Sequence, residues 1–319
     1  MPTTRPLLYL SRLLPDPVMA LVRERFQLVQ EPTESSPAPA ALRDGFSRAE
    51  AVICTLTDTV DDELLSSAAH VKILANYAVG FNNIDLAAAR RRQIVVTNTP
   101  DVLTDTTADL TWALLLATAR RVVEGDAVVR SKRWTGWTPT QLLGSEVSGK
   151  TLGIIGMGRI GRAVAQRAEG FRMAIRYHSH RSLPTLPSAW ESRSLDALLQ
   201  ESDFATLHVP LNADTRHLIG TRELSLMRPT AILINTSRGP VVDEAALAHA
   251  LRSGTIAGAG LDVYEEEPTV HPVLLSLKQV VLLPHLGSAT MQTRVQMGLI
   301  CLENIQAVLQ GRPAPNRVA

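Results

Sequence analysis

Residues 151–161 read TLGIIGMGRIG, a short apolar run that passes directly into the spacing GxGxxG. The apolar run predicts a buried strand, and the residues after Gly161 predict a helix. In such a turn Gly156 reverses the chain, Gly158 lets the backbone approach a pyrophosphate, and Gly161 permits close packing of helix on strand. The N-terminus of the helix would face the phosphates. Glycine-rich turns are common between strands and helices, so this stretch alone leaves an ordinary turn and a dinucleotide site equally open.

The composition narrows the class of protein. The chain has 319 residues, 45% of them hydrophobic, which suits a globular protein of about two domains. Its 32 basic and 31 acidic side chains give a net charge of +1, so neither a nucleic acid nor a membrane surface is expected as a partner. Cys54 and Cys301 are too few for a disulfide framework or a metal cluster, so we expect a cytoplasmic protein without a metal. Residues 1–14 lack the apolar core of a secretion signal, and no run approaches the roughly twenty apolar residues of a membrane span.

Apolar runs and helical periodicities alternate along the chain, which predicts parallel sheets. Predicted strands cover residues 7–10, 51–54, 72–75, 94–96, 151–155, 173–177, 204–210, 231–235, 260–263 and 280–283. Predicted helices include residues 17–26, 61–69, a long helix at 106–129 that crosses between the domains, and 291–309. We therefore predict an α/β protein with two doubly wound parallel-sheet domains. A Rossmann cofactor domain, residues 100–290, would be inserted into a flavodoxin-like substrate domain, residues 1–99 plus 291–319.

Three ionisable residues, Arg238, Glu267 and His285, fall in loops after successive predicted strands. Singly, each has an ordinary explanation, such as a surface ion pair for Arg238 or a solvated acidic run for Glu267. The carboxyl ends of parallel strands share one edge, however, and that edge also carries the glycine turn. Hydride transfer to a 2-keto acid needs a cation for the carboxylate, a proton donor for the developing alkoxide and a nicotinamide cofactor. We predict that His285 is the acid and that Glu267 stabilises its imidazolium form.

Two further loops have competing interpretations. In residues 76–85 the glycine at position 80 leaves backbone amides exposed, which could hold a small carboxylate, although an ordinary turn explains this stretch better when it is taken alone. Trp134 and Trp137 indicate an interface, a pocket wall or a small apolar cluster covering the sheet, and the sequence does not rank these.

The strand at residues 173–177 is followed by His178-Ser179-His180-Arg181. A site for the unphosphorylated dinucleotide normally carries Asp or Glu here, to bind the ribose hydroxyls. Without that carboxylate, and with His180 and Arg181 nearby, a 2′-phosphate would be attracted. We therefore predict NADP as the cofactor, with NAD possible.

The chain resembles the D-isomer-specific 2-hydroxyacid dehydrogenase family over nearly its whole length, and within it the glyoxylate/hydroxypyruvate reductases. The segments that carry the resemblance are residues 101–108, 134–139, 153–161, 235–239, 260–263, 267–268, 271–272 and 284–290. The resemblance implies that Arg238 binds the carboxylate and keto oxygens of a small 2-keto acid, that His285 is the general acid/base and that Glu267 is its partner. It also implies a homodimer, in which the loop carrying Trp134 and Trp137 reaches towards the neighbouring active site.

The resemblance also implies roles for residues that bind cofactor and substrate. Asp262 would hydrogen-bond the nicotinamide carboxamide, and the amides of Val79 and Gly80 would hold the substrate carboxylate. The predicted cofactor-binding residues are Thr104, Gly156, Met157, Gly158, Arg159, Ile160, Gly161, Ser179, His180, Arg181, Val209, Pro210, Thr215, Thr236, Ser237, Asp262, Gly287 and Ser288. The predicted substrate-binding residues are Val79, Gly80, Arg238, His285 and Trp137.

Two features of the family pattern are altered. Ser179 stands where many members have an acidic residue, which favours NADPH over NADH. Arg172 stands where a glycine is common before the strand, so Gly170 is expected to supply that turn. The alternative functions are another 2-hydroxyacid dehydrogenase, such as a 2-ketogluconate reductase or a phosphoglycerate dehydrogenase, and a non-enzymatic dinucleotide sensor resembling corepressors of this fold. The expected absence of a regulatory or low-complexity extension disfavours the last two.

Overall fold

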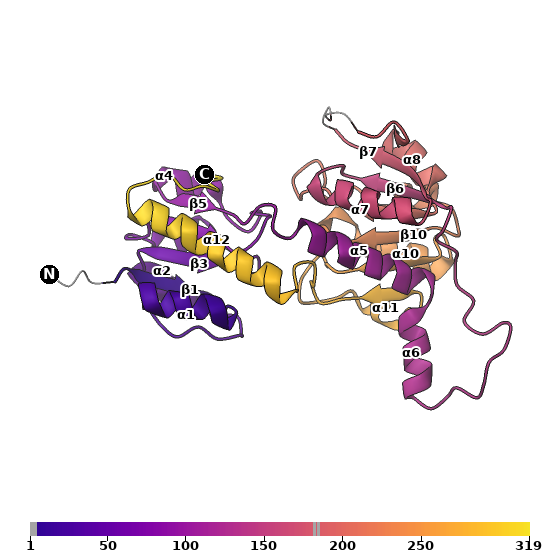
Figure 1. Ribbon diagram of the computed structural model, residues 1–319, viewed down its shortest axis with the longest axis horizontal. Helices are drawn as coiled ribbons and strands as arrows, with labels where there is room; N and C mark the ends of the chain where they lie inside the picture. The colour runs from indigo at the N-terminus through magenta and orange to yellow at the C-terminus, as the bar shows by residue number, and fades with distance from the viewer. Residues whose placement is uncertain (1–4, 181–182, 184–185) are drawn as a thin grey trace. The chain divides into compact units, whose positions relative to one another are not determined.

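The computed structural model describes residues 5–180, 183 and 186–319, and the chain forms two compact units (Figure 1). Unit 1 consists of Met1–Leu103 with Ser288–Ala319, and unit 2 of Thr104–Gly287. The predicted boundaries, 99/100 and 290/291, lie a few residues from these divisions. Each unit contains one parallel sheet with helices on both faces, so the predicted α/β fold with two doubly wound sheets is confirmed.

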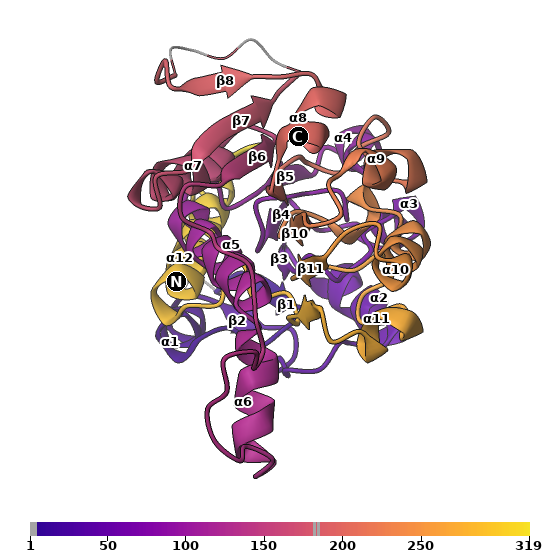
Figure 2. The same ribbon diagram turned by 90° about the vertical axis from the view of Figure 1, so that its right-hand side faces the viewer.

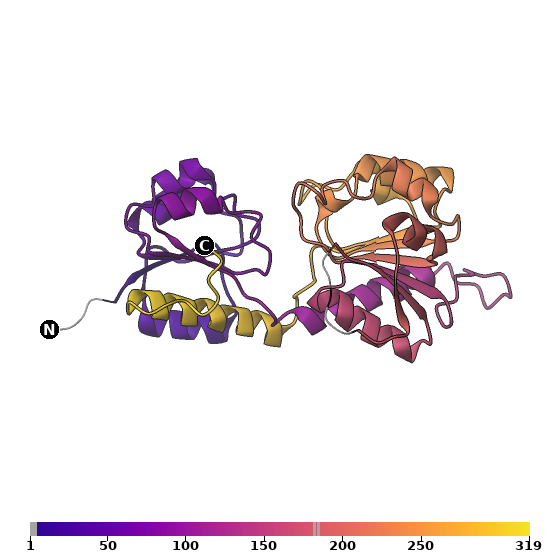
Figure 3. The same ribbon diagram turned by 90° about the horizontal axis from the view of Figure 1, so that it is seen from above.

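Unit 1 has a five-stranded parallel sheet in the order β2-β1-β3-β4-β5. The strands are β1 (Leu7–Leu10), β2 (Gln27–Leu28), β3 (Ala51–Cys54), β4 (Ile73–Asn76) and β5 (Val95–Thr97). Helices α1 (Asp16–Arg25) and α12 (Met291–Leu309) cover one face, and α2 (Pro39–Arg48), α3 (Asp62–Ser66) and α4 (Leu86–Arg91) cover the other (Figure 3). Successive side chains of a strand point to opposite faces. Accordingly, Leu8 and Leu10 join the core under α1 and α12, and Tyr9 joins the core under α2.

Unit 2 has a seven-stranded parallel sheet in the order β12-β11-β10-β9-β6-β7-β8. The strands are β6 (Thr151–Ile155), β7 (Ala174–His178), β8 (Trp190–Ser192), β9 (Phe204–Leu207), β10 (Ile232–Asn235), β11 (Gly258–Leu261) and β12 (Val280–Leu282). Helices α5 (Thr104–Ala119) and α7 (Arg159–Gly170) pack on one face, and α8 (Leu195–Glu201), α9 (Thr221–Leu226), α10 (Glu244–Ser253) and α11 (Pro272–Ser276) on the other. The direction of strand order reverses between β6 and β9. In open α/β sheets, ligands bind outside the carboxyl ends of the strands at such a point.

The single helix predicted at residues 106–129 is wrong. Helix α5 ends at Ala119, and α6 (Val122–Arg130) begins after Arg121, whose φ of 54° is left-handed. Two guanidinium nitrogens of Arg121 donate to the Glu124 carboxylate at 2.9 Å, which stabilises the change of direction. Both helices belong to unit 2, and α6 extends away from its sheet (Figure 2).

The expectation that Gly170 supplies the turn before β7 is also wrong. Helix α7 runs to Gly170, and Arg172 adopts the left-handed conformation with φ 55°. Its N–H donates to the Glu169 carbonyl at 2.9 Å, which closes the helix end although the residue carries a Cβ. Among the helices of the described residues, none combines the length and hydropathy that crossing a bilayer requires.

Candidate active site

The glycine turn joins β6 to α7 at the point where the strand order reverses. Gly156 has φ +99°, and a Cβ there would lie 2.7 Å from the His208 carbonyl group, so a larger residue does not fit. A Cβ on Gly161 would lie 2.2 Å from the Gly156 carbonyl oxygen. By contrast, a Cβ on Gly158 would meet no described atom within 4 Å. This open side at the N-terminus of α7 fits a dinucleotide diphosphate, since the first amides of a helix attract anions.

Three ionisable side chains follow three adjacent strands of the same sheet. Arg238 follows β10, Glu267 follows β11 and His285 follows β12. His285 Nδ1 lies 2.8 Å from Glu267 Oε2, and each of the two side chains is 24% exposed. The Glu267 Oε1 atom accepts the Tyr264 N–H at 3.2 Å. Within the described residues, His285 Nε2 has no hydrogen-bond partner, so that ring atom is available to a ligand.

The electrostatics of this cluster favour the charged form of Glu267. Burial alone would raise the pKa of Glu267, but the hydrogen bond and charge of His285 lower it below its ordinary value, with a smaller contribution from Arg238. Burial lowers the pKa of Arg238, and the negative charge of Glu267 opposes this. Arginine nevertheless stays protonated in proteins. The site therefore presents a cation, Arg238, together with an ionised carboxylate that contacts His285.

Asp262 shapes the loop that carries His285. Its two carboxylate oxygens accept the amide hydrogens of Leu286 at 2.6 Å and Gly287 at 2.8 Å, and its carbonyl accepts the N–H of His285 at 3.0 Å. Burial raises the pKa of Asp262, while these amides and His285 lower it in part. Thr107 Oγ1 also donates to the Gly287 carbonyl at 2.9 Å. Asp262 therefore fixes the backbone around His285, which has a φ of 56°.

Asn235 shapes the loop that carries Arg238. Its Oδ1 accepts the Ser237 N–H at 3.0 Å and the Ser237 hydroxyl at 2.8 Å, and its Nδ2 donates to the Arg238 carbonyl at 3.0 Å. Sequence reasoning did not assign a role to Asn235. The signal was present, because an Asn at the end of a strand, before a polar turn, is typical of an Asx turn.

Comparison with known proteins places this arrangement in a family. Residues 112–287 match the family profile described as "D-isomer specific 2-hydroxyacid dehydrogenase, NAD binding domain". The chain is 48% identical over 320 residues to a glyoxylate reductase of Thermococcus litoralis, covering 98% of this chain and 97% of the relative. It is 45% identical to a glyoxylate reductase of Pyrococcus furiosus, with 98% and 95% covered. The chain belongs to the D-isomer specific 2-hydroxyacid dehydrogenase family.

Solved structures agree with this family membership. A protein from Thermus thermophilus superimposes with a TM-score of 0.92 at 45% identity, covering 98% of this dehydrogenase and 100% of that chain. An NADPH-dependent glyoxylate/hydroxypyruvate reductase from Sinorhizobium meliloti, solved with NADP and malonate, gives 0.89 at 35% identity, with 99% and 97% covered. The predicted resemblance to this family is confirmed.

The end of β7 carries the residues predicted to select the cofactor. His178 Nδ1 lies 3.1 Å from the Arg193 carbonyl oxygen, and the His178 and His180 rings meet edge to face with centroids 5.1 Å apart. Ser179 is half-buried and His180 is exposed. Arg181 lies outside the described residues, so its predicted contact stays a prediction.

The remaining predicted cofactor residues lie in the turns of unit 2 or at its boundary. Thr215 is buried, and its hydroxyl donates to the Pro210 carbonyl at 2.6 Å within the loop that follows β9 and Val209. The hydroxyls of Thr236 and Thr111 lie 2.8 Å apart. The other members are placed by their elements: Met157 is buried in the glycine turn, Arg159 and Ile160 begin α7, Thr104 begins α5, and Ser288 begins the second segment of unit 1.

In unit 1 the predicted carboxylate-binding loop follows β4. Asn76 Nδ2 donates to the Gly80 carbonyl at 2.8 Å, and Asn98 Nδ2 donates to the Val79 carbonyl at 2.8 Å. Both carbonyl groups are thus turned towards side chains of unit 1. Among the described residues, no acceptor is hydrogen-bonded to the amides of Val79 or Gly80. These amides fit the binding of a small anion.

Trp134 and Trp137 are exposed, by 55% and 79% respectively. A cluster that covers the sheet would be buried, so that interpretation is wrong. An interface or a pocket wall completed by another chain remains.

Proposed function

We propose that this dehydrogenase reduces a small 2-keto acid of the glyoxylate or hydroxypyruvate type to the D-2-hydroxy acid, with NADPH as the preferred cofactor. The observation that carries the proposal is the His285–Glu267 contact of 2.8 Å. Together with Arg238, this pair lies at the carboxyl edge of the sheet, which also carries the glycine turn. The glyoxylate reductases at 45–48% identity support the choice of substrate class.

The proposed mechanism assigns one task to each side chain. Arg238 binds the substrate through its carboxylate and polarises the keto oxygen, because a guanidinium presents two parallel donors. His285 holds a proton on Nε2 and donates it to that oxygen as negative charge develops. Glu267 keeps the ring oriented through Nδ1 and stabilises its charged form. The amides of Val79 and Gly80 bind the substrate carboxylate. A bound nicotinamide dinucleotide supplies the hydride.

The proposed cofactor site uses the turns that follow the strands of unit 2. Gly156, Gly158 and Gly161 would admit the diphosphate, and Asp262 would contact the nicotinamide carboxamide. We propose NADPH over NADH because Ser179 offers no negative charge to a 2′-phosphate and His180 is exposed beside it. The Sinorhizobium meliloti relative, described as NADPH-dependent, supports this choice.

A spectrophotometric panel tests the activity. We expect oxidation of NADPH with glyoxylate or hydroxypyruvate, and slower oxidation with 2-ketogluconate, pyruvate or phosphohydroxypyruvate. Phosphohydroxypyruvate as the best substrate would instead favour a phosphoglycerate dehydrogenase. Dinucleotide binding without turnover of any 2-keto acid would favour a sensor.

We further propose that the dehydrogenase is a homodimer that pairs through the arm formed by residues 121–144. No side chain of α6 is buried, and the arm exposes an unusual number of large apolar side chains. These are Val122, Val123, Val129, Trp134, Trp137 and Leu143. A patch of this kind marks an interaction site in a soluble protein. We propose that Trp137 reaches the partner's substrate site.

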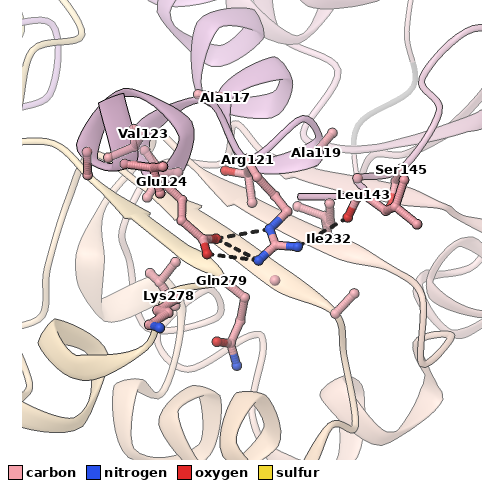
Figure 4. A pocket seen from close by; sticks show the side chains of 18 of the residues that line it. Ala117, Ala119, Arg121, Val123, Glu124, Leu143, Ser145, Ile232, Lys278 and Gln279 are labelled. Carbon is pink, nitrogen blue, oxygen red and sulfur yellow. Dashed lines mark hydrogen bonds and ion pairs between the residues drawn. The ribbon is translucent and has the colours of Figure 1, made fainter. Parts of the chain in front are cut away.

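Residues of the arm, among them Val123, Glu124 and Leu143, line one part of a pocket of about 780 Å³ (Figure 4). Arg121 points into this pocket, where it pairs with Glu124 and approaches the Leu143 carbonyl at 3.4 Å. The pocket is otherwise lined largely by small and apolar residues such as Ala117, Ile232 and Val281, which suits an apolar segment of a second copy. Light scattering of the wild type should give twice the mass of one chain, and Val123→Asp with Val129→Asp should give a single chain.

A further inference from the structure

A buried carboxylate, that of Glu244, is hydrogen-bonded to the loop that carries Glu267. Glu244 is the first residue of α10 and is 7% exposed. Its Oε1 accepts the N–H of Glu265 at 2.6 Å, and its Oε2 accepts the N–H of His271 at 3.3 Å. One side chain therefore binds both ends of the loop at residues 265–271, and Glu267 lies between those ends.

The attachment at Glu265 is reciprocal. Glu265 Oε2 accepts the N–H of Glu244 at 3.0 Å, and Glu265 Oε1 contacts Nε2 of His217 at 2.5 Å. The start of the loop is thus fixed to the N-terminus of α10 from both directions. Orphan amides at a helix N-terminus bind carboxylates well, which compensates part of the desolvation of Glu265.

Tyr264, the residue before Glu265, adds two further hydrogen bonds to this loop. Tyr264 donates its N–H to Glu267 Oε1 at 3.2 Å and its hydroxyl to the Leu283 carbonyl at 2.8 Å. Leu283 lies two residues before His285 in the chain. Tyr264 therefore links Glu267 to the segment that leads from β12 to His285, and a shift of the adjacent Glu265 would act on this link and move Glu267 relative to His285.

A buried carboxylate is costly unless it is hydrogen-bonded, and Glu244 obtains its hydrogen bonds from the two ends of this loop. Burial raises the pKa of Glu244, the two amide hydrogen bonds lower it in part, and the nearby charges of Glu265 and His271 act in opposite directions. Among the described residues, Glu244 is hydrogen-bonded to neither Glu267 nor His285, so any effect on that pair passes through the loop.

We propose that Glu244 is a positioning residue, whose carboxylate fixes both ends of the 265–271 loop and thereby holds Glu267 against His285 Nδ1. This inference rests on the proposed function only in that the His285–Glu267 pair delivers the proton. Each carboxylate oxygen of Glu244 accepts one backbone N–H. Gln cannot replace it, because its side-chain NH2 group would face one of the two N–H donors.

The test compares Glu244→Gln with Glu223→Gln as a matched control. Glu223 also lies in the first turn of a helix of unit 2 and also accepts a backbone amide, that of Gly220, at 3.1 Å. For Glu244→Gln we expect kcat with the keto acid to fall by roughly tenfold, a fraction of what a general acid contributes. The KM for the dinucleotide should stay unchanged. The alkaline limb of the pH profile should move to lower pH, because a displaced Glu267 stabilises the charged histidine less.

A double-mutant cycle gives the sharper result. In a Glu267→Gln background, Glu244→Gln should no longer move the alkaline limb, because the group that it positions is already neutral. Should Glu244→Gln fold poorly, Glu244→Asp draws the carboxylate back by one methylene and should move the limb in the same direction by less.

Three outcomes would overturn the inference: a Glu244→Gln variant that matches the Glu223→Gln control, an alkaline limb that stays in place in Glu244→Asp, or a limb that moves equally in the Glu267→Gln background. The proposed function has its own test in His285→Ala. If that variant keeps its turnover, the proposed function fails. If it loses turnover while Glu244→Gln behaves as the control, only this inference fails.

Discussion

Both sheets are parallel and doubly wound, although their strand orders differ, and the loops at their carboxyl edges carry different chemistry. In unit 1 the edge combines the amides of Asn76 and Asn83 with a buried carboxylate, Asp58, which accepts hydrogen bonds from Ser11 and the Thr55 N–H and pairs with Arg12 at 3.4 Å. In unit 2 the edge brings together Arg238, Glu267 and His285. A parallel sheet provides a place for a ligand, and the side chains after each strand decide what happens to it. We therefore expect changes to Arg238, Glu267 or His285 to affect catalysis, and changes to the loop after β4 of unit 1 to affect substrate binding.

The largest expected effect is that of His285→Ala. Loss of the general acid should lower kcat by about 10²- to 10⁴-fold and leave the affinity for the dinucleotide nearly unchanged. Steady-state kinetics and cofactor titration measure the two quantities. Turnover close to that of the wild type at saturating substrate would exclude His285 from the mechanism.

Arg238→Lys should be almost as damaging as His285→Ala. An ammonium group cannot reproduce the planar pair of donors, so both kcat and the KM for the keto acid should suffer. A defect confined to cofactor binding would contradict the assigned role. The matched control is Arg228→Lys, in an exposed ion pair with Asp203 at 3.1 Å, which should have little effect.

Ser179→Asp tests the chemistry of the cofactor edge. A charge-assisted hydrogen bond to a 2′-phosphate is worth about 1.5 to 3 kcal/mol, or roughly ten- to a hundredfold in affinity. The carboxylate should repel that phosphate and bind the free ribose hydroxyls, so the ratio of kcat/KM for NADPH over NADH should fall by this factor. Ser179→Asn, which is similar in shape but neutral, should change the ratio less. A wild-type enzyme that prefers NADH would refute the reasoning.

Asn76→Ala should separate binding from chemistry. Its side chain is fully buried and holds the Gly80 carbonyl, so the substitution should raise the KM for the keto acid by roughly tenfold with little change in kcat. Asn304→Ala removes another buried asparagine of unit 1, with Nδ2 bonds to Ile300 and Asn316, and should lower stability without changing KM. Equal effects of the two variants on KM would mean that the loop has no special role.

The smallest expected effect is that of Arg172→Gly. A residue with a Cβ is strained at φ 55°, so glycine should raise the free energy of unfolding by about 0.5 to 1 kcal/mol after its greater chain entropy is subtracted. Arg172→Ala retains the Cβ and should bring no such gain. Thermal unfolding of both variants, with unchanged kcat, would confirm a local backbone effect.

The sequence allowed the sheets and the set of ionisable residues to be predicted, because apolar runs mark buried parallel strands and the loops after them share one edge. It did not allow the break at Arg121 to be predicted, because no glycine or proline marks it. The short strands β2 and β8 and the helices α2, α8, α9, α10 and α11 were not predicted either; each has ten residues or fewer, so its apolar pattern is brief. The anchors Asp262 and Glu244 bind amides 21 to 27 positions away in the chain, and no local pattern reports such contacts.

The two ends of the arm lie close together, and this affects how its length can differ between members of the family. The Ser145 N–H donates to the Ala119 carbonyl at 2.8 Å, so the chain returns to unit 2 beside the place where it left. The ends of the arm are therefore joined independently of its length, and doubling the length of a flexible loop costs only about 0.6 kcal/mol. Its length and apolar surface can therefore change from one protein to another while the strands that carry the catalytic residues keep their register.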